Sequence, residues 1–152
     1  MRMETIDHTT PNPVSNVLSG FYKNAAMGAD SISTSLPEVD DMKLRRELFV
    51  QRAYYEDQKR DITQQMAEIW LEPMESGRMA RKCSNMIIRM KAKAGMTRDT
   101  AAKLMVEGTN MGMVQLHQVL NHNPNIPDEF HAQGEKILEH EIAYLDRLTP
   151  YL

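Results

Sequence analysis

Apolar residues recur at intervals of three and four along most of the chain, which is the spacing of one face of an α-helix. The first such stretch begins at Asn12-Pro13, where an N-cap residue precedes a proline in the first helical position, and it ends near Pro37. The second begins at Asp40 or Asp41 and continues for about seven turns to Pro73. No stretch alternates between apolar and polar residues as a half-buried strand would, so the pattern predicts an all-α protein.

Three more helices are expected in the second half of the chain. A short helix runs from about Ser76 to Ala94 and stops at Gly95, a residue suited to the position after a helix end. The next begins after the N-cap residue Thr97 and ends in the turn-forming residues 121–127. Pro127 opens the last helix, which continues to the C-terminus. The sequence thus predicts four long helices and one short helix.

The lengths of the connections predict how these helices are arranged. Short links join the first two long helices and the last two, and short links make antiparallel neighbours. Residues 73–96 form a long connection that contains the short helix. Two hairpins joined by such a crossover are the plan of a ferritin-like four-helix bundle. We therefore expect one helical-bundle domain over residues 13–152, preceded by a flexible polar tail over residues 1–12.

Composition and charge exclude several classes of protein. The chain has 152 residues with 41% hydrophobic residues, which is enough for one domain with its own core. A single cysteine, Cys83, rules out a disulfide framework, and the N-terminus lacks the apolar core of a signal peptide. No apolar run approaches the ~18 residues of a membrane-spanning helix, and the net charge of −3 does not indicate a nucleic-acid-binding protein. We expect a soluble cytoplasmic protein.

One carboxylate breaks the apolar face of the last predicted helix. Ile137, Tyr144 and Leu148 share that face, and Glu141 lies on it between them. In an apolar setting such a carboxyl group is a candidate metal ligand or a general acid with a raised pKa. It is equally able to serve as a buried structural group that is hydrogen-bonded to neutral partners, and we favour this second interpretation.

The chain supplies neutral partners for a buried carboxylate. Glutamines occur at seven-residue spacing on the inward face of the second helix, and one borders the fourth; tyrosines accompany them on the second and last helices. The inward face of the second helix ends at Ile69 in this interpretation. A buried polar layer of this kind can fix the register of a helical bundle. The predicted polar core consists of Gln51, Tyr54, Tyr55, Gln58, Gln65, Gln115, Glu141 and Tyr144.

The two predicted hairpins share short motifs. Gln51-Arg-Ala-Tyr54 on the second helix corresponds to Glu141-Ile-Ala-Tyr144 on the last, and Asn24 with Gly28 on the first helix corresponds to Asn110 with Gly112 on the fourth. With its helix number and connection lengths, the chain resembles the ferritin-like superfamily over most of residues 13–150. Members with a dinuclear metal site carry Glu-x-x-His on the second and last helices and a Glu on each of the other two.

The resemblance implies the fold and argues against the metal chemistry. Gln51 stands where such members carry Glu, and Tyr54 and Tyr144 stand where they carry His. The first and fourth helices offer glycines rather than an inward Glu. Because the single carboxylate Glu141 cannot hold two metal ions, we expect no cofactor, and a metal ion bound near Glu141 is kept as an alternative.

Three glycines lie inside predicted helices: Gly28, Gly108 and Gly112. Each costs about 1 kcal/mol of helix stability relative to Ala, so some other interaction should compensate. Close approach of neighbouring helices is the simpler explanation, and a pocket for a small ligand lined by these glycines is the other.

The short predicted helix is strongly basic and rich in methionine. Between Ser76 and Arg98 there are cations and no acid: Arg78, Arg81, Lys82, Arg89, Lys91, Lys93 and Arg98. We expect this helix to lie across the acidic bundle and complete its core, although a face rich in Met also suits a protein partner. A membrane surface and nucleic acid are the less favoured partners, and the helix has no Trp or Phe of the kind that usually anchors a membrane-surface helix.

The remaining candidate groups do not point to a reaction. His117, His122, His131 and His140 lie off the apolar faces or in a turn, and we interpret them as surface residues. The chain has no nucleophile elbow, no glycine-rich phosphate loop and no Cys-x-x-Cys motif.

The hypothesis that fits the sequence best is a non-enzymatic bundle with a structural or protein-interaction role. We expect a homo-oligomer, because the end of the long second helix needs something to cover Ile69 and Trp70. The alternatives are a metal-binding or oxidoreductase bundle with an atypical site around Glu141, and a bundle that binds a small ligand.

Overall fold

The computed structural model describes residues 12–73 and 97–152, and over these ranges the chain is helical, without a strand. Within these ranges the structure has four long helices and two single-turn 3-10 helices. Their bounds are α1 (Pro13–Ser35), η1 (Leu36–Glu38), α2 (Met42–Glu68), α4 (Arg98–His122), α5 (Asp128–Leu148) and η2 (Thr149–Tyr151). The prediction of an all-α fold with four long helices is confirmed. The predicted short helix over residues 76–94 lies outside the described residues, as does all of the predicted tail except Asn12.

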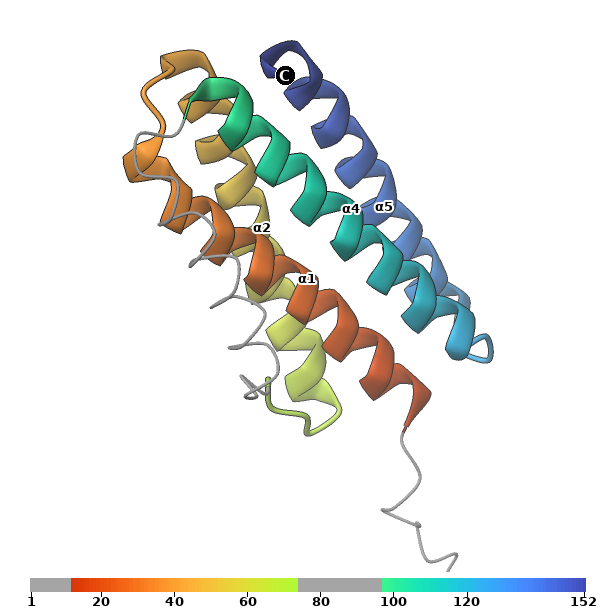
Figure 1. Cartoon of the computed structure of the whole chain (residues 1–152). Coiled ribbons are helices and arrows are strands. Elements are labelled where there is room, and N and C mark those ends of the chain that lie inside the picture. Colours follow the sequence, from red (N-terminus) through yellow and green to blue (C-terminus); the bar gives the residue numbers. More distant parts are fainter. Residues whose placement is uncertain (1–11, 74–96) are drawn as a thin grey trace, which may run out of the picture.

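The four helices form a bundle in which neighbours are antiparallel (Figure 1). α1 and α5 run in one direction, and α2 and α4 run in the opposite direction. α1 packs against α2 and α4, and α5 packs against α4 and, less closely, against α2. The bundle therefore consists of two helical hairpins, α1–α2 and α4–α5, as the connection lengths predict.

The starts of the helices follow from residues visible in the sequence. The Asn12 side chain accepts a hydrogen bond from the Val14 N–H at 3.0 Å, and Pro13 occupies the first helical position. The Asp41 carboxylate accepts from the Leu44 N–H at 2.8 Å, which caps α2 in the same way. These interactions satisfy backbone donors that a helix start otherwise leaves without a partner.

The end of α2 differs from the expected one, because the helix stops several residues before Pro73. Trp70 adopts a left-handed backbone conformation with φ of 59°, and its N–H donates to the Ala67 carbonyl at 3.2 Å. The next N–H, of Leu71, donates to the Met66 carbonyl at 2.8 Å. This pair of hydrogen bonds is a Schellman motif, which normally has Gly where this chain has Trp70. The helix therefore ends in a turn before Pro73, and the spacing of apolar residues does not reveal this turn.

Replacing Trp70 with Gly is expected to stabilise the protein by about 1 kcal/mol, because Gly adopts the left-handed conformation without the steric cost that a Cβ imposes. The Trp70 side chain is 97% exposed, so little packing is lost. The free energy of unfolding from urea titration checks this. Trp70→Ala is the control, since it keeps the Cβ and should gain little; equal gains in the two variants would contradict the explanation.

The core consists of two apolar clusters, one at each end of the bundle. Ile32, Leu48 and Leu148 belong to the cluster near η1, and Phe21 and Ile137 belong to the cluster at the other end.

Most residues of the apolar faces predicted for α1, α2, α4 and α5 are buried. Ile69, the expected last member of the α2 face, is 37% exposed because the helix has already ended. The buried Glu141 of α5 lies between Leu138 and Tyr144, where the two clusters meet, whereas the buried Gln51 of α2 lies within the cluster near η1.

Candidate functional site

Glu141 is the buried carboxylate at the centre of the bundle. Its side chain is 1% exposed and accepts two hydrogen bonds from neutral donors. The Tyr55 hydroxyl on α2 donates to Oε2 at 2.8 Å, and the Asn24 amide on α1 donates to Oε1 at 3.1 Å. Burial raises the pKa of Glu141, and the two hydrogen bonds and the nearby Arg147 oppose this effect only in part. The carboxylate thus connects three helices through amide and phenol groups.

Two of the predicted glycines make room for these donors. A Cβ at Gly28 would lie 2.4 Å from Cε2 of the Tyr55 ring, and a Cβ at Gly112 would lie 2.4 Å from Oδ1 of Asn24. These glycines therefore make room for side chains of facing helices. The expected close approach of helix backbones is not the reason for them. The third predicted glycine, Gly108, lines a cavity between α1 and α4.

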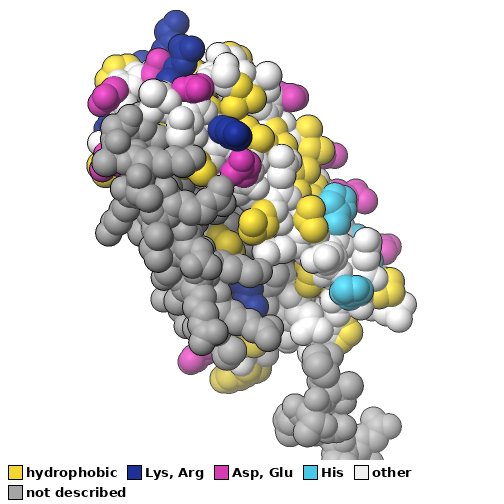
Figure 2. All heavy atoms as spheres, in the orientation of Figure 1, with side chains coloured by type: hydrophobic (Ala, Val, Ile, Leu, Met, Phe, Trp, Pro, Cys, Tyr) yellow, Lys and Arg dark blue, Asp and Glu magenta, His cyan; other side chains and the backbone are white. Residues whose placement is uncertain are grey.

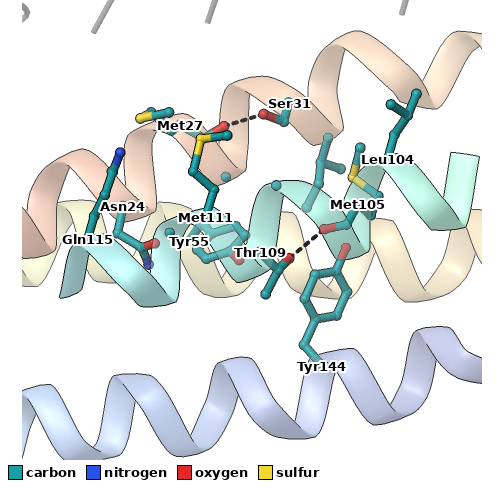
Figure 3. A pocket seen from close by; sticks show the side chains of 14 residues that line it. Asn24, Met27, Ser31, Tyr55, Leu104, Met105, Thr109, Met111, Gln115 and Tyr144 are labelled. Carbon is teal, nitrogen blue, oxygen red and sulfur yellow. Dashed lines mark hydrogen bonds between the residues drawn. The ribbon is translucent and has the colours of Figure 1, made fainter. Parts of the chain in front are cut away.

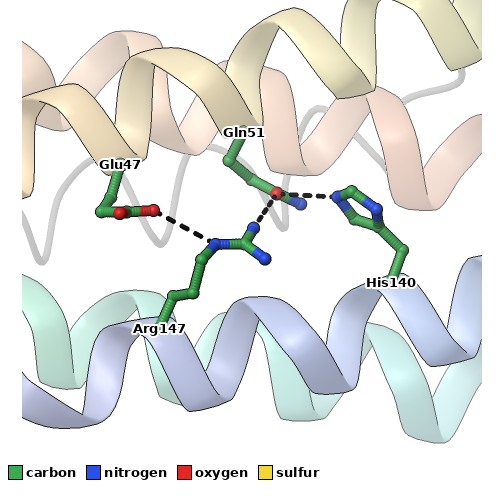
Figure 4. Close-up of polar contacts among 4 residues, drawn as sticks. All are labelled: Glu47, Gln51, His140 and Arg147. Carbon is green, nitrogen blue, oxygen red and sulfur yellow. Dashed lines mark hydrogen bonds and ion pairs between the residues drawn. The ribbon is translucent and has the colours of Figure 1, made fainter.

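A second polar group lies where α2 faces α5 (Figure 4). Nε of Arg147 lies 3.1 Å from Oε2 of Glu47, and an Nη of Arg147 donates to the Gln51 carbonyl oxygen at 3.3 Å. Nε2 of His140 lies 3.1 Å from the same oxygen. Because the Gln51 oxygen can only accept, His140 must donate from Nε2. Long polar side chains thus fill the space between these two helices.

His140, which the sequence predicts to be a surface residue, is half-buried. Its ring stacks on Tyr54, with ring centroids 3.4 Å apart and planes inclined by 10°. Burial lowers the pKa of His140, and the positive charge of Arg147 lowers it further. His140 lies beside the apolar face of α5, where its ring packs against Tyr54 of α2.

The other residues of the predicted polar core fall into separate places. Gln58 donates to the Tyr54 hydroxyl at 2.7 Å, and Gln65 exchanges two hydrogen bonds with Gln133 on α5 at 2.9 and 2.8 Å. Gln115 and Tyr144 line the cavity between α1 and α4. Among the described residues, three buried polar atoms find no hydrogen-bond partner: Nε2 of Gln51, Oε1 of Gln58 and the hydroxyl of Tyr144.

The corresponding motif residues of the two hairpins are similarly buried on α2 and α5, but not on α1 and α4. Gln51 on α2 and Glu141 on α5 are both buried at mid-length. Asn24 on α1 reaches the core, whereas its counterpart on α4, Asn110, is exposed. The shared motifs of the two hairpins therefore do not place equivalent side chains in the core.

The arrangement does not bring metal ligands together. Within residues 12–73 and 97–152, no three His, Cys, Asp or Glu side chains lie close enough to share a metal ion. His117 and His122 are exposed, and Nε2 of His131 lies 3.1 Å from the Pro124 carbonyl oxygen. Cys83 and the predicted basic residues lie outside the described residues: Arg78, Arg81, Lys82, Arg89, Lys91 and Lys93.

The raised pKa of Glu141 predicts how stability depends on pH. The folded state holds the Glu141 proton more tightly than the unfolded state, so its contribution is lost as the pH rises from the ordinary value of 4.5 through the raised pKa. We expect the free energy of unfolding of the wild type, relative to Glu141→Gln, to fall between pH 4 and pH 8. Urea titrations of both proteins across this range measure it, and a difference that increases with pH would contradict the assignment.

The predicted polar core left out Asn24, Glu47 and Arg147, and of these only Asn24 is indicated by the sequence pattern. Asn24 lies three residues after Phe21 and four before Gly28, which places it on the inward face of α1. Glu47 and Arg147 gave no signal, since their pairing across 100 residues depends on the register of two helices.

An open groove formed by the first half of α2 with the end of α1 and η1, which we call the α2 groove, is the other distinctive surface. It has a volume of about 880 Å³ and contains three exposed apolar side chains: Met42 (75%), Phe49 (59%) and Val50 (57%). Its lining also includes four cations and no acid: Lys43, Arg45, Arg46 and Arg52.

The cations of the α2 groove have different roles. Arg45 donates to the Leu36 and Val39 carbonyls and so ties η1 to α2. The Arg52 guanidinium lies 5.0 Å from the centroid of the Phe49 ring, a cation–π distance. In the described part of the chain, Lys43, Arg46 and Arg52 form no ion pair. The groove therefore combines apolar side chains with positive charge that is available to a partner.

Comparisons with protein families, curated proteins and solved structures give no match to this chain. None of the helices within residues 12–73 and 97–152 has both the length and the hydropathy needed to cross a bilayer.

Proposed function

We propose that this protein is a non-enzymatic bundle, with ferritin-like connectivity, that binds a protein partner through the α2 groove. The directions of the helices support the ferritin-like plan. The buried polar core has a structural role in this proposal, because Tyr55 and Asn24 already use both oxygens of Glu141. Its position at the meeting point of two apolar clusters suits a group that fixes helix register.

The observation that carries the proposal is the exposure of Phe49, Met42 and Val50 beside cations that form no ion pair with the described residues. Monomeric surfaces rarely gather large apolar side chains without a function. Aromatic, Met and Arg residues are enriched where proteins bind one another. The partner that fits is an acidic amphipathic helix, whose apolar face covers Phe49 and whose carboxylates pair with Arg46 and Arg52.

A second copy of the chain fits this groove less well. In a symmetric dimer the same patch meets itself, so Lys43, Arg46 and Arg52 of two copies would face one another and repel. The expected homo-oligomer and the expected cytoplasmic location remain predictions. The molar mass in solution, measured by light scattering, tests the first.

The test uses a synthetic helical peptide with Leu at three- and four-residue spacing and Glu elsewhere, labelled for fluorescence anisotropy. We expect a Kd of about 10–100 μM that weakens as salt is added. Phe49→Ala should weaken binding by about tenfold or more, because a central aromatic anchor is lost. Arg46→Glu with Arg52→Glu should abolish binding through like-charge repulsion.

Two controls separate this surface from general charge attraction. Arg60→Glu removes a cation of α2 that pairs with Asp57 on the surface, and it should leave binding unchanged. A peptide with Lys in place of Glu should not bind. Equal binding of the two peptides, or unchanged affinity in the Phe49→Ala variant, would overturn the proposal.

A further inference from the structure

A cavity of about 40 Å³ lies between α1 and α4, beside the polar core (Figure 3). Tyr55 from α2 and Tyr144 from α5 complete its wall. A water molecule needs roughly 10–15 Å³ of such space, and a cavity of about 150 Å³ holds benzene. The cavity is therefore too large for one water and fits a molecule of about two to four non-hydrogen atoms.

One group in this cavity lacks the partner that its burial demands. Tyr144 is 1% exposed, and its hydroxyl has no hydrogen-bond partner among the described residues. In Figure 3 this hydroxyl points from α5 toward α4 and the cavity. An unpaired buried hydroxyl costs about 1–3 kcal/mol, so a bound molecule that accepts its hydrogen bond would recover that cost.

The two aliphatic hydroxyl groups at the cavity are occupied. The Thr109 hydroxyl donates to the Met105 carbonyl at 2.7 Å, and the Ser31 hydroxyl donates to the Met27 carbonyl at 2.7 Å. The lining contains no charged side chain. Burial and the nearby carboxylate raise the pKa of Tyr144, so the phenol stays protonated and able to donate.

The rest of the wall is apolar and adaptable. Met27, Met105 and Met111 line the cavity, and flexible Met side chains adjust to different shapes. Met111 is 48% exposed, which places one edge of the cavity at the surface. On the face shown in Figure 2, apolar side chains gather over α4, so an apolar molecule would reach the cavity along a compatible surface.

We propose that this cavity binds a small uncharged molecule, mainly apolar and with one oxygen acceptor, which receives a hydrogen bond from the Tyr144 hydroxyl. Short ketones, aldehydes and alcohols share this chemistry. An anion is excluded, because it would lie unpaired in an apolar space close to the Glu141 carboxylate. The site is separate from the α2 groove and independent of the proposed protein partner.

The test uses acetone as the probe and its charged isostere acetate as the comparison. Methionine methyl groups labelled with ¹³C report binding by NMR. We expect saturable shifts at Met27, Met105 and Met111 with a Kd of about 1–10 mM, since four non-hydrogen atoms contribute little binding energy. Met42, exposed on α2, is the internal control and should not shift. Acetate should cause no saturable shift.

Tyr144→Phe tests the hydrogen-bond donor. The variant keeps the ring and removes the unpaired hydroxyl, so it should fold with equal or greater stability while acetone binds about five- to tenfold more weakly. Unchanged affinity in this variant would overturn the role of Tyr144. Shifts that do not saturate by about 100 mM, or equal binding of acetate, would overturn the site itself and show that the space holds water only.

Discussion

Glu141→Leu is expected to lower the free energy of unfolding by about 2–5 kcal/mol, because the change leaves two buried donors without an acceptor. The Tyr55 hydroxyl and the Asn24 amide both donate to Glu141 in the centre of the bundle. Each unpaired donor costs about 1–3 kcal/mol, and the similar volume of Leu does not replace the lost hydrogen bonds. Urea titration at pH 7 measures the change.

Two further variants of α5 separate the hydrogen bonds from other effects. Glu141→Gln retains an acceptor for Tyr55 and removes the cost of a buried charge, so we expect it within about 1 kcal/mol of the wild type. Glu139→Leu changes an exposed residue of the same helix and should lie within about 0.5 kcal/mol. If Glu141→Leu were as stable as the wild type, the carboxylate would have no structural role.

Gly28→Ala is expected to destabilise the protein by about 2 kcal/mol. The added Cβ would lie 2.4 Å from the Tyr55 ring, which the hydrogen bond to Glu141 holds in place. Overpacking costs about 1–3 kcal/mol, sometimes more, and the better helix propensity of Ala returns about 1 kcal/mol. Chemical denaturation of the variant measures the net effect.

The sign of this effect should reverse when the ring is removed. In a Tyr55→Ala background, Gly28→Ala meets no ring, so we expect it to stabilise by about 1 kcal/mol through helix propensity alone. Gly20→Ala is the matched control on α1, because the atoms nearest to its Cβ would be those of the Val119 side chain at 3.0–3.4 Å, a much looser contact than at Gly28, so it should cost less than Gly28→Ala. A destabilisation that persists in the Tyr55→Ala background would contradict the steric explanation.

The helices and their inward faces could be predicted from the sequence because both depend on local signals. The Asn12 and Asp41 caps and the three- and four-residue spacing of apolar residues act within one helix. The end of α2 could not be predicted, since Trp70 occupies a left-handed position that favours Gly. Within the sequence, Pro73 is the stronger signal for a helix end. In the structure the helix ends earlier, and Leu71 packs against the core.

The candidate site could be predicted only as a set of inward-facing polar residues. Periodicity gives the face on which Glu141 lies, but its partners come from other helices, separated by 86 and 117 residues in the sequence. Which residues meet depends on the register and spacing of the helices. The pairing of His140 with Tyr54, and the exposed groove of α2, are likewise products of packing rather than of local pattern.

The role of Glu141 is tested most directly by elemental analysis of protein purified without a His-tag. We expect the wild type and Glu141→Gln to contain the same small, substoichiometric amounts of transition metals, because the hydrogen-bond partners of Glu141 are a neutral amide and a phenol and, among the described residues, no three His, Cys, Asp or Glu side chains come together. One metal ion per chain in the wild type, lost in Glu141→Gln, would contradict a structural polar core and favour a metal site at Glu141.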